Sequence, residues 1–557
     1  MAYDLRREPW IPFRRRSGEA VWGPAKFLTD KINDDPIVAL AAPRPDFNGA
    51  LLEFLIGLIT VALQPEDEEA WRDGWRNPPL PERLQFAFDA LPPAFDLDGD
   101  GPRFMQDDSP DDFSDDEANS IDTLLIDAAG GQTARLNKDL FVKRDRIDTL
   151  GRPAAAIALL TLQTYAPSGG QGHRTSMRGG GPLTTLIEPR VRDGTNGLEN
   201  ETRADELPLW SKLWANVETV DQWRERGPDS ATMGAEALYP WLARTRISDP
   251  KRQGRPTTLQ DAHPLQAYFG MPRRIRLVFE PRTGRCEITG REDTVLATGF
   301  YGRNYGVQYN SWLHPLTPYY KDKDGNWLPT HGQSDGIGWR DWAGLLFGTP
   351  DNSKRPAQCV AHFRAHRARR ADVPNPRLHA FGYDMDNMKA RGWVEAELPA
   401  FALDDDARIK LLSNVAANLT EAASIVASGL LIAVKAAWFA RADDTKGDLS
   451  YVKARLWSDT QEDFFLAMKT LANDATRELQ VRRGFLMPLE TAVLGIFDSL
   501  CPMEGLEFAD MRRLVSARHN LRRTLQGYGK LGDKFFAALA IQSVQTPKTG
   551  RKKKEAA

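Results

Sequence analysis

The sequence contains little cysteine. Its three cysteines, Cys286, Cys359 and Cys501, are spread over 557 residues, so they cannot form the disulfide framework of a small secreted protein. The first residues, MAYDLRREPWIPF, also lack the continuous apolar stretch of a secretory signal. We therefore expect the protein to occupy a reducing cytoplasm.

Long apolar runs are scarce as well. The longest covers residues 50–63 (ALLEFLIGLITVAL), contains Glu53, and is shorter than the ~20 residues of a membrane-spanning helix. We interpret it as a buried helix and expect no membrane segment. Apolar residues make up 41% and charged residues 27%, which is ordinary for folded proteins. Because a single core stops growing at ~250–300 residues, a chain of this length should form at least two domains.

Motifs that are typical of several enzyme classes are also absent. The chain has no GxxxxGK(S/T) phosphate-binding loop, no HExxH zinc motif and no CxxC pair. We therefore expect no catalytic residues and no cofactor. One alternative stays open, in which His173, beside Arg174 in a Gly-rich segment, acts as the general base of a free-standing hydrolase. No partner acid or nucleophile for His173 is evident.

The best match to a metal site is DLDGDG at residues 96–101. It resembles the first half of an EF-hand loop and has Asp107 in place of the bidentate Glu. Pro92, Pro93 and Pro102 argue against the flanking helices and the regular loop of an EF-hand. A polar turn is the favoured interpretation, and we predict no bound metal.

The charge balance restricts any contact with nucleic acid. The chain has 73 basic and 76 acidic residues, which gives a net charge of −3. A free-standing nucleic-acid-binding protein usually has an excess of basic residues. Any contact with nucleic acid must therefore be local.

The character of the sequence changes near residue 400. Before it, short β-like runs at 182–187 and 274–280 alternate with helical patches and Gly- and Pro-rich connections. We expect an α+β protein whose residues 1–400 form a large, irregular mixed α/β domain. From Asp404 onward, apolar residues recur at helical spacing. The first such seam comprises Ile409, Leu412, Ala416, Leu419, Ala423, Val426, Leu430, Ala433 and Ala437.

Further amphipathic segments cover residues 449–472, 476–500 and 507–541. Together with the first helix they predict a four-helix bundle over residues 401–544, in which adjacent helices run antiparallel. The tail at 545–557 (QTPKTGRKKKEAA) is polar and basic, and we expect it to be disordered.

Three segments combine glycine, aromatic and basic residues: 140–146 (LFVKRDR), 166–181 (APSGGQGHRTSMRGGG) and 300–309 (FYGRNYGVQY). The second has six glycines in 16 residues, with Arg174 and Arg178 between the clusters. Without side chains, a backbone can lie in a narrow groove or approach phosphates. A flexible surface linker explains the composition equally well. In the first segment, a Phe beside cations suits either single-strand binding or a buried ring next to solvated charges.

Two other basic clusters allow the same pair of interpretations. Residues 364–370 (RAHRARR) hold four arginines. In the last helical segment, Arg512, His519 and Arg523 fall at spacings of 7 and 4 and therefore share one helix face. Either cluster could contact a DNA strand through its phosphates, but a solvated helix face is the commoner explanation.

Several segments together resemble the CasA-type large subunit of the type I-E CRISPR Cascade complex. Their order and spacing, followed by the helical C-terminal region, carry the resemblance over essentially the full chain. The segments are residues 8–13 (EPWIPF), 42–47 (APRPDF), 103–106 (RFMQ), 137–144 (NKDLFVKR), 166–185 (APSGGQGHRTSMRGGGPLTT) and 381–387 (FGYDMDN).

The resemblance implies a non-catalytic subunit of an RNA-guided complex. Such a subunit recognises the PAM in double-stranded target DNA, mainly from the minor groove, and starts invasion by the guide strand. Its implied partners are the guide RNA, the target duplex, the other Cascade subunits and a nuclease-helicase recruited after R-loop formation. Base pairing then selects the long target, while protein recognises only a short motif.

The resemblance also assigns roles to particular positions. Phe141, Val142 and Lys143 match the loop that holds the 5′ handle of the guide RNA. The family's glycine loop falls on residues 168–172, where Ser168 and Gln171 replace two glycines of a related sequence. The implied contacts with DNA in this loop are Gly169, Gly170, Gln171 and Gly172.

Two further sites follow from the same alignment. A groove-probing lysine of the family aligns with Asn304, next to Arg303, so that either side chain could read the groove. The strand-separating wedge aligns with Asp386, Asn387 and Met388, with Asn387 as the expected wedge residue and Met388 as an apolar insertion.

One position departs from the family. Some relatives carry two cysteine pairs where this chain has residues 150–154 (LGRPA) and 284–286 (GRC). A structural zinc site needs four ligands, and only Cys286 is present here. We predict no zinc.

Overall fold

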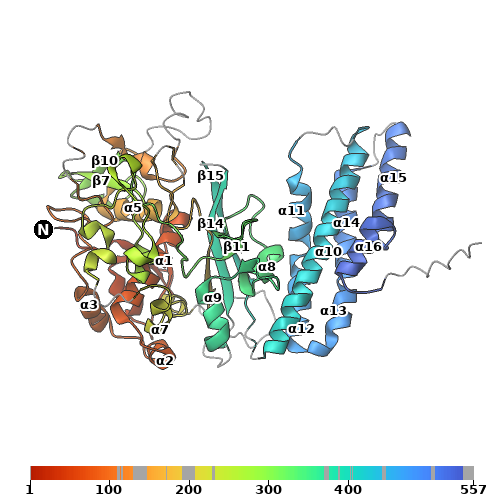
Figure 1. The fold of residues 1–557 in the computed structure, drawn as a ribbon, viewed down its shortest axis with the longest axis horizontal. Coiled ribbons are helices and arrows are strands. Elements are labelled where there is room, and N and C mark those ends of the chain that lie inside the picture. The colour runs from red at the N-terminus through yellow and green to blue at the C-terminus, as the bar shows by residue number, and fades with distance from the viewer. Residues whose placement is uncertain are drawn as a thin grey trace, which may run out of the picture. The chain divides into compact units, whose positions relative to one another are not determined.

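The computed structural model describes residues 2–109, 113, 117–128, 147–167, 169–170, 172–190, 207–228, 233–368, 376–386, 389–401, 403, 405–441, 447–502 and 508–542. The chain forms two compact units (Figure 1). The first unit comprises Met1–Gly336 and Asn352–Ala402, and the second comprises Ile337–Asp351 and Leu403–Ala557.

The first unit is built from several small antiparallel sheets. Their strand orders are β2-β1-β3, β4-β10-β5 with β7 paired to β10, β12-β11-β13, β15-β14-β6 and β8-β9. The strands are β1 (Ile11–Arg15), β2 (Ala20–Gly23), β3 (Ile37–Leu40), β4 (Asn119–Ser120), β5 (Leu150–Gly151), β6 (Thr184–Glu188), β7 (Arg274–Glu280), β8 (Gly284–Arg285), β9 (Glu292–Asp293), β10 (Leu296–Arg303), β11 (Tyr319–Lys321), β12 (Trp327–Pro329), β13 (Lys354–Arg355), β14 (Arg377–Asp386) and β15 (Lys389–Pro399).

The helices of this unit form its core and its edges. They are α1 (Pro45–Leu63), α2 (Glu68–Arg76), α3 (Pro81–Asp89), α5 (Arg152–Tyr165), α6 (Leu209–Trp214), α7 (Val220–Arg224) and α9 (Gln358–His362). The helix α1 is apolar on nearly every side, because it is the central core helix and packs against α5. Its Phe54 ring makes edge contacts with Trp10, Phe104 and Phe269.

Two helices, α1 and α10 (Asp406–Trp438), are long and apolar enough to cross a membrane by length and composition alone. In α1, 78% of the apolar window is buried inside the protein, and Glu53 lies within it with only 4% of its surface exposed. The apolar run at 50–63 is therefore a buried helix in this structure, as the sequence predicts.

The hairpin of β14 and β15 is the longest strand pair of the first unit. The register places Asp386 opposite Lys389 at its tip. Near the other end, β6 pairs with β14 between Thr184–Phe381 and Glu188–Arg377. The Trp393 side chain of β15 stacks on Phe381, with ring centroids 5.7 Å apart. The hairpin is thus anchored in the unit through its base.

A buried histidine joins all three strands of this sheet. The imidazole of His379 lies between Glu188 and Glu395, with Nδ1 3.3 Å from the first carboxylate and Nε2 2.8 Å from the second. Burial alone would lower the pKa of His379, but the hydrogen bonds and charges of the two carboxylates outweigh it and raise the pKa to about 9. The side chain is therefore an imidazolium at neutral pH.

We expect the contribution of His379 to stability to depend on pH. Because its folded pKa is raised, the contribution is complete below the unfolded pKa of ~6.5 and is lost as the pH rises through about 9. The variant His379→Gln should be less stable than the parent by roughly 2–3 kcal/mol at pH 6, and the difference should shrink by pH 9.5. Urea denaturation of both proteins at the two pH values measures it. A difference that stays constant would contradict the imidazolium assignment.

The second unit is helical. It contains α8 (Trp339–Leu346), α10, α11 (Ser450–Asp459), α12 (Gln461–Asn473), α13 (Glu478–Gly484), α14 (Leu486–Leu500), α15 (Phe508–Leu525) and α16 (Gly529–Ala538). Apart from α8, these helices form four consecutive helical segments. They are α10 alone, α11 with α12, α13 with α14, and α15 with α16. The α+β class with a helical C-terminal bundle is confirmed (Figure 1).

The helix α10 is the central element of this bundle. Its N-cap is Asp405, whose side chain accepts a hydrogen bond from the amide of Ala407 at 2.9 Å. Its predicted apolar seam is buried from Leu412 to Ala437, and only Ile409 in the first turns is half-buried. It packs against α11, α14, α15 and α16.

The helix α8 precedes residue 400 in the chain but belongs to the helical unit. Its Trp339 stacks on Phe464 of α12 at a centroid distance of 4.4 Å and meets Trp457 of α11 at 4.7 Å. The indole N–H of Trp339 also donates to the carbonyl of Trp457 at 2.9 Å. An aromatic helix from upstream therefore completes the core of the bundle.

Candidate nucleic-acid interface

The glycine-rich segment at 166–181 follows directly after α5 and contacts the end of β10. The carbonyl of Gly172 accepts a hydrogen bond from the amide of Tyr305 at 2.7 Å. A Cβ atom on Gly172 would lie 2.8 Å from the Cβ of Asn304, and its φ of +79° also favours glycine. Two segments that the sequence predicts to contact DNA therefore touch each other.

The other end of the same segment contacts the β14 strand near the hairpin tip. A Cβ atom on Gly181 would lie 2.7 Å from Cγ of Met385 and 2.9 Å from Cβ of Tyr383. Gly181 has a φ of +62° and donates its amide hydrogen to the carbonyl of Tyr165 at 3.1 Å. The glycine-rich segment thus connects Asn304 on one side with the strand that leads to Asp386 on the other.

The residues at these junctions are accessible. Gly169, Gly170, Asn304 and Asp386 are exposed, and Gly172 and Arg303 are half-buried. The structure therefore places the described residues of the glycine loop, the Asn304 site and the hairpin tip in the same unit, with at least one exposed residue in each. Six predicted site residues lie outside the described residues: Gln171, Asn387, Met388 and the guide-RNA positions Phe141, Val142 and Lys143.

Arg178, in the same segment, has a structural role. The residue is only 4% exposed, and its guanidinium donates to Glu53 at 2.6 Å, to Thr184 at 2.9 Å and to Thr317 at 2.9 Å. Tyr165 donates to the same Glu53 carboxylate at 2.7 Å. Arg178 is therefore not available to DNA. It fixes the glycine-rich segment to α1.

Arg174 and Arg303 lie nearer the surface. Arg174 donates from Nε to the hydroxyl of Ser248 at 2.7 Å, and its guanidinium lies 5.6 Å from the centre of the Tyr305 ring. Arg303, the last residue of β10, lies 5.5 Å from the centre of the Phe113 ring. Both cations are held beside the Asn304 loop, where they can add positive potential to the site.

His173 does not have the surroundings of a general base. Its Nδ1 lies 2.7 Å from Nη1 of Arg273, and because a guanidinium only donates, Nδ1 must accept. Desolvation by its neighbours and the Arg273 charge lower the pKa of His173. The basic lone pair of the neutral ring is therefore occupied, which argues against the hydrolase alternative.

One enzyme motif that we expected to be absent, GxSxG, does occur in the chain, at Gly332 to Gly336 (GQSDG). In hydrolases with this motif, the serine occupies a sharp turn between a strand and a helix. Here Ser334 lies in an exposed turn, with neither a strand directly before it nor a helix directly after it. The match therefore gives no support to a serine nucleophile.

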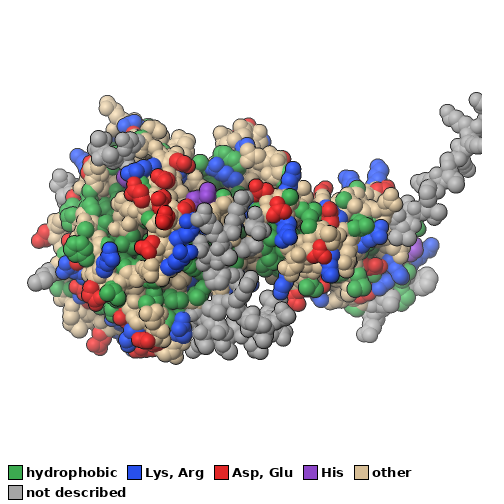
Figure 2. All heavy atoms as spheres, turned by 90° about the horizontal axis from the view of Figure 1, so that it is seen from below, with side chains coloured by type: hydrophobic (Ala, Val, Ile, Leu, Met, Phe, Trp, Pro, Cys, Tyr) green, Lys and Arg blue, Asp and Glu red, His purple; other side chains and the backbone are tan. Residues whose placement is uncertain are grey.

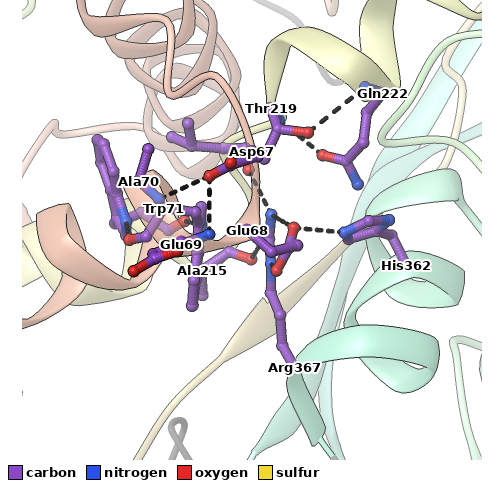
Figure 3. Close-up of polar contacts among 12 residues, drawn as sticks. Asp67, Glu68, Glu69, Ala70, Trp71, Ala215, Thr219, Gln222, His362 and Arg367 are labelled. Atoms are coloured by element: carbon purple, nitrogen blue, oxygen red, sulfur yellow. Dashed lines mark hydrogen bonds and ion pairs between the residues drawn. The ribbon is translucent and has the colours of Figure 1, made fainter.

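The basic segment at 364–370 is also partly structural. Arg367 is 2% exposed and lies 4.0 Å from the centre of the Trp71 ring. Glu68 accepts from Arg367 at 3.0 Å and from Nε2 of His362 at 2.6 Å (Figure 3). Partial burial would raise the pKa of Glu68, but these two partners lower it to about 2. Arg367 is thus neither a phosphate contact nor part of a solvated face.

The stripe on α15 lies in the second unit. Arg512, His519 and Arg523 are all exposed, whereas Leu514 and Leu521 on another face are buried. The stripe can accept a DNA strand or simply be solvated. Figure 2 shows Lys and Arg interspersed with Asp and Glu on the face that it draws, in keeping with the net charge of −3.

Each of the two segments considered for metals has a residue that forms an ion pair. Asp107 pairs with Arg274 and accepts from Thr245 at 3.0 Å. Arg152, which follows Leu150–Gly151, forms an ion pair with Asp293 at 2.6 Å, and both residues line a cavity of about 220 Å³ that Cys286 also lines. Within the described ranges, no group of three or more His, Cys, Asp or Glu could hold a metal ion.

Comparison with known proteins identifies the family of the chain. Residues 4–496 match the family model described as CRISPR-associated protein Cse1. The chain belongs to the CRISPR-associated Cse1 family. The predicted resemblance to a CasA-type large subunit is thereby confirmed.

Solved Cse1 structures have the same fold. CasA from Thermus thermophilus superimposes with a TM-score of 0.67 at 17% identity, covering 94% of this chain and 99% of that one. Cse1 from Thermobifida fusca gives 0.67 at 18% identity, with 96% and 98% covered. A chain from a structure titled CRISPR RNA-guided surveillance complex gives 0.64 at 17% identity, with 94% and 99% covered.

Proposed function

We propose that this Cse1 protein is the non-catalytic large subunit of a type I-E Cascade complex in antiviral defence. In this role it recognises the PAM of duplex DNA from the minor groove and promotes strand separation and R-loop formation. The observation that carries the proposal is the contact between Gly172 and Asn304, because it joins a backbone without side chains to an exposed amide.

The chemistry of these residues suits a narrow groove. Exposed glycines at 169 and 170 let the backbone approach sugars and base edges without a colliding Cβ. The Asn304 amide both donates and accepts, so it can bond the purine N3 and pyrimidine O2 acceptors or the guanine amino group. Because the minor-groove pattern is degenerate, such a site would tolerate more than one PAM sequence.

The β14–β15 hairpin would then act on the adjoining base pair. The base of the hairpin is fixed by β6 and by the His379 ion pairs. A force that DNA exerts on the tip at residues 386–389 would therefore be borne by the whole sheet. An inserted side chain can unstack a base step for a few kcal/mol. Asn387 and Met388 are proposed as the inserting residues.

The remaining partners complete the proposal. Phe141, Val142 and Lys143 would hold the 5′ handle of the guide RNA and dock the subunit on the other Cascade subunits. Arg512, His519 and Arg523 would contact a DNA strand. The nuclease-helicase would be recruited after the R-loop forms, and the assembly would function in the cytoplasm.

Binding of PAM-containing duplex by the assembled complex tests the proposal. Asn304→Ala should lower the affinity roughly 5- to 150-fold, which corresponds to ~1–3 kcal/mol for one base-edge contact, and guide loading should survive. Asn473→Ala, at the exposed end of α12, is the matched control and should have no effect. Unchanged PAM-dependent affinity in Asn304→Ala and Asn387→Ala, or substrate turnover by the isolated chain, would overturn the proposal.

A further inference from the structure

Arg273, immediately before β7, carries a charge that no carboxylate neutralises within the described part of the chain. Its side chain is directed to Pro167 and His173, and its Nε is buried without a hydrogen-bond partner. Burial lowers the pKa of Arg273 to about 10. Burying a guanidinium without a carboxylate partner lowers the stability of the fold. We therefore expect Arg273 to have a role other than forming an ion pair.

The backbone of Arg273 is fixed by one buried amide. Gln163 of α5 is 2% exposed, accepts from the Arg273 amide at 2.9 Å and donates to the Arg273 carbonyl at 3.0 Å. The same Nε2 of Gln163 donates to the carbonyl of Met105 at 3.1 Å. The backbone from which the Arg273 side chain extends toward the glycine loop is therefore held in place.

The glycine loop is shaped around this side chain. Arg273 donates from Nη2 to the carbonyl of Pro167 and from Nη1 to Nδ1 of His173. A Cβ atom on Gly169 would lie 2.8 Å from the Cβ of His173 and 3.0 Å from Nη1 of Arg273. Glycine at 169 thus makes room for the pair of side chains as well as for a ligand.

The contact with Arg273 also fixes which ring nitrogen of His173 carries the proton. Since Nδ1 accepts, the proton of the neutral ring is on Nε2. His173 is exposed, and its amide donates to the carbonyl of Gly170 at 3.3 Å. A neutral N–H donor is therefore presented from the loop whose Gly172 touches Asn304.

We propose that His173 is a further contact of this loop with the target duplex, donating from Nε2 to a minor-groove acceptor, and that Arg273 is the positioning residue that fixes this donor. The inference rests on the proposed function. Each base pair offers a purine N3 or a pyrimidine O2 in the minor groove. The contact would therefore add affinity at a fixed place along the duplex without selecting among base pairs.

The first test uses His173→Ala in the assembled complex. A neutral hydrogen bond contributes about 0.5–1.5 kcal/mol, so the affinity for PAM duplex should fall roughly 2- to 13-fold. The dependence on salt should not change, because no charge is removed. A salt slope that falls by about one would show a charged phosphate contact instead and would overturn the inference.

A second test changes the DNA and measures its binding by the unmodified complex. A 3-deazapurine lacks the N3 acceptor, and it is placed at each purine of the PAM segment in turn. At one of these positions, the unmodified complex should lose as much affinity as His173→Ala loses on the ordinary duplex. On that duplex, His173→Ala should bind as the unmodified complex does. If the two losses add at every position, His173 bonds no purine N3, and the same series with pyrimidine analogues that lack O2 decides the matter: the inference fails if those losses add as well.

The role of Arg273 is tested by conservative replacement. Arg273→Lys keeps a donor for Nδ1 and should retain most of the affinity, whereas Arg273→Met should lose as much as His173→Ala. The double variant Arg273→Met with His173→Ala should be no weaker than either single one. If Asn304→Ala weakens binding but His173→Ala does not, the inference fails and the proposed function stands. If His173→Ala, Asn304→Ala and Asn387→Ala all leave binding unchanged, the proposed function fails as well.

Discussion

Replacing Arg178 with methionine is expected to lower the free energy of unfolding by about 3–5 kcal/mol. The variant leaves the Glu53 carboxylate inside an apolar helix without its cation, and a buried charge without a partner is strongly destabilising. Thr184 and Thr317 also lose the donor that they share. Urea denaturation followed by tryptophan fluorescence measures the change.

Two further variants separate the ion pair from general damage. Arg174→Met, in the same segment, removes a half-buried cation whose guanidinium donates to the hydroxyl and the carbonyl of Ser248, and it should cost much less. The double variant Glu53→Leu with Arg178→Met removes both charges and should be more stable than Arg178→Met alone. If Arg174→Met and Arg178→Met are equally harmful, the anchoring role of Arg178 is wrong.

Replacing Gly172 with alanine is expected to lower the affinity for PAM duplex roughly 10- to 100-fold. The new Cβ would lie 2.8 Å from the Cβ of Asn304 and 3.2 Å from the amide nitrogen of Tyr305. One of these loops must therefore shift, and Asn304 loses its place beside the glycine loop. The positive φ adds ~1–2 kcal/mol of backbone strain.

Strain and displacement can be distinguished with Gly325→Ala. Gly325 has a similar φ of +84°, but nothing lies within 4 Å of its Cβ position. Both variants should lower the melting temperature slightly, and only Gly172→Ala should lose binding by the assembled complex. Equal affinities of the two variants for PAM duplex would show that the contact with Asn304 has no role in DNA recognition.

The helical unit could be predicted closely from the sequence because its signals are local. The 3,4 spacing of apolar residues in α10 and the aspartates at its start depend only on neighbouring positions. The role of α8 could not be predicted in this way, because Trp339 packs on residues more than 100 positions away. Nothing in its local pattern indicates which unit it joins.

The candidate site shows the same limit. Glycine content alone left open whether residues 166–181 form a linker or a binding loop, since contacts with Asn304 and Met385 come from distant parts of the chain. The sequence did contain one unused signal, a single Glu53 inside an apolar run, which indicates a buried partner. Gln163 and Arg273 carried no comparable signal, because their roles depend on backbone groups that only the fold brings together.

The central claim is that the glycine loop and Asn304 form one surface for the minor groove of the PAM. Electron cryo-microscopy of the assembled complex bound to a PAM-containing duplex tests it most directly. We expect the minor groove to lie against Gly169, Gly170 and Asn304, with the tip of the β14–β15 hairpin at the first separated base pair. A duplex bound on another face of the first unit, with these residues still exposed to solvent, would contradict the account.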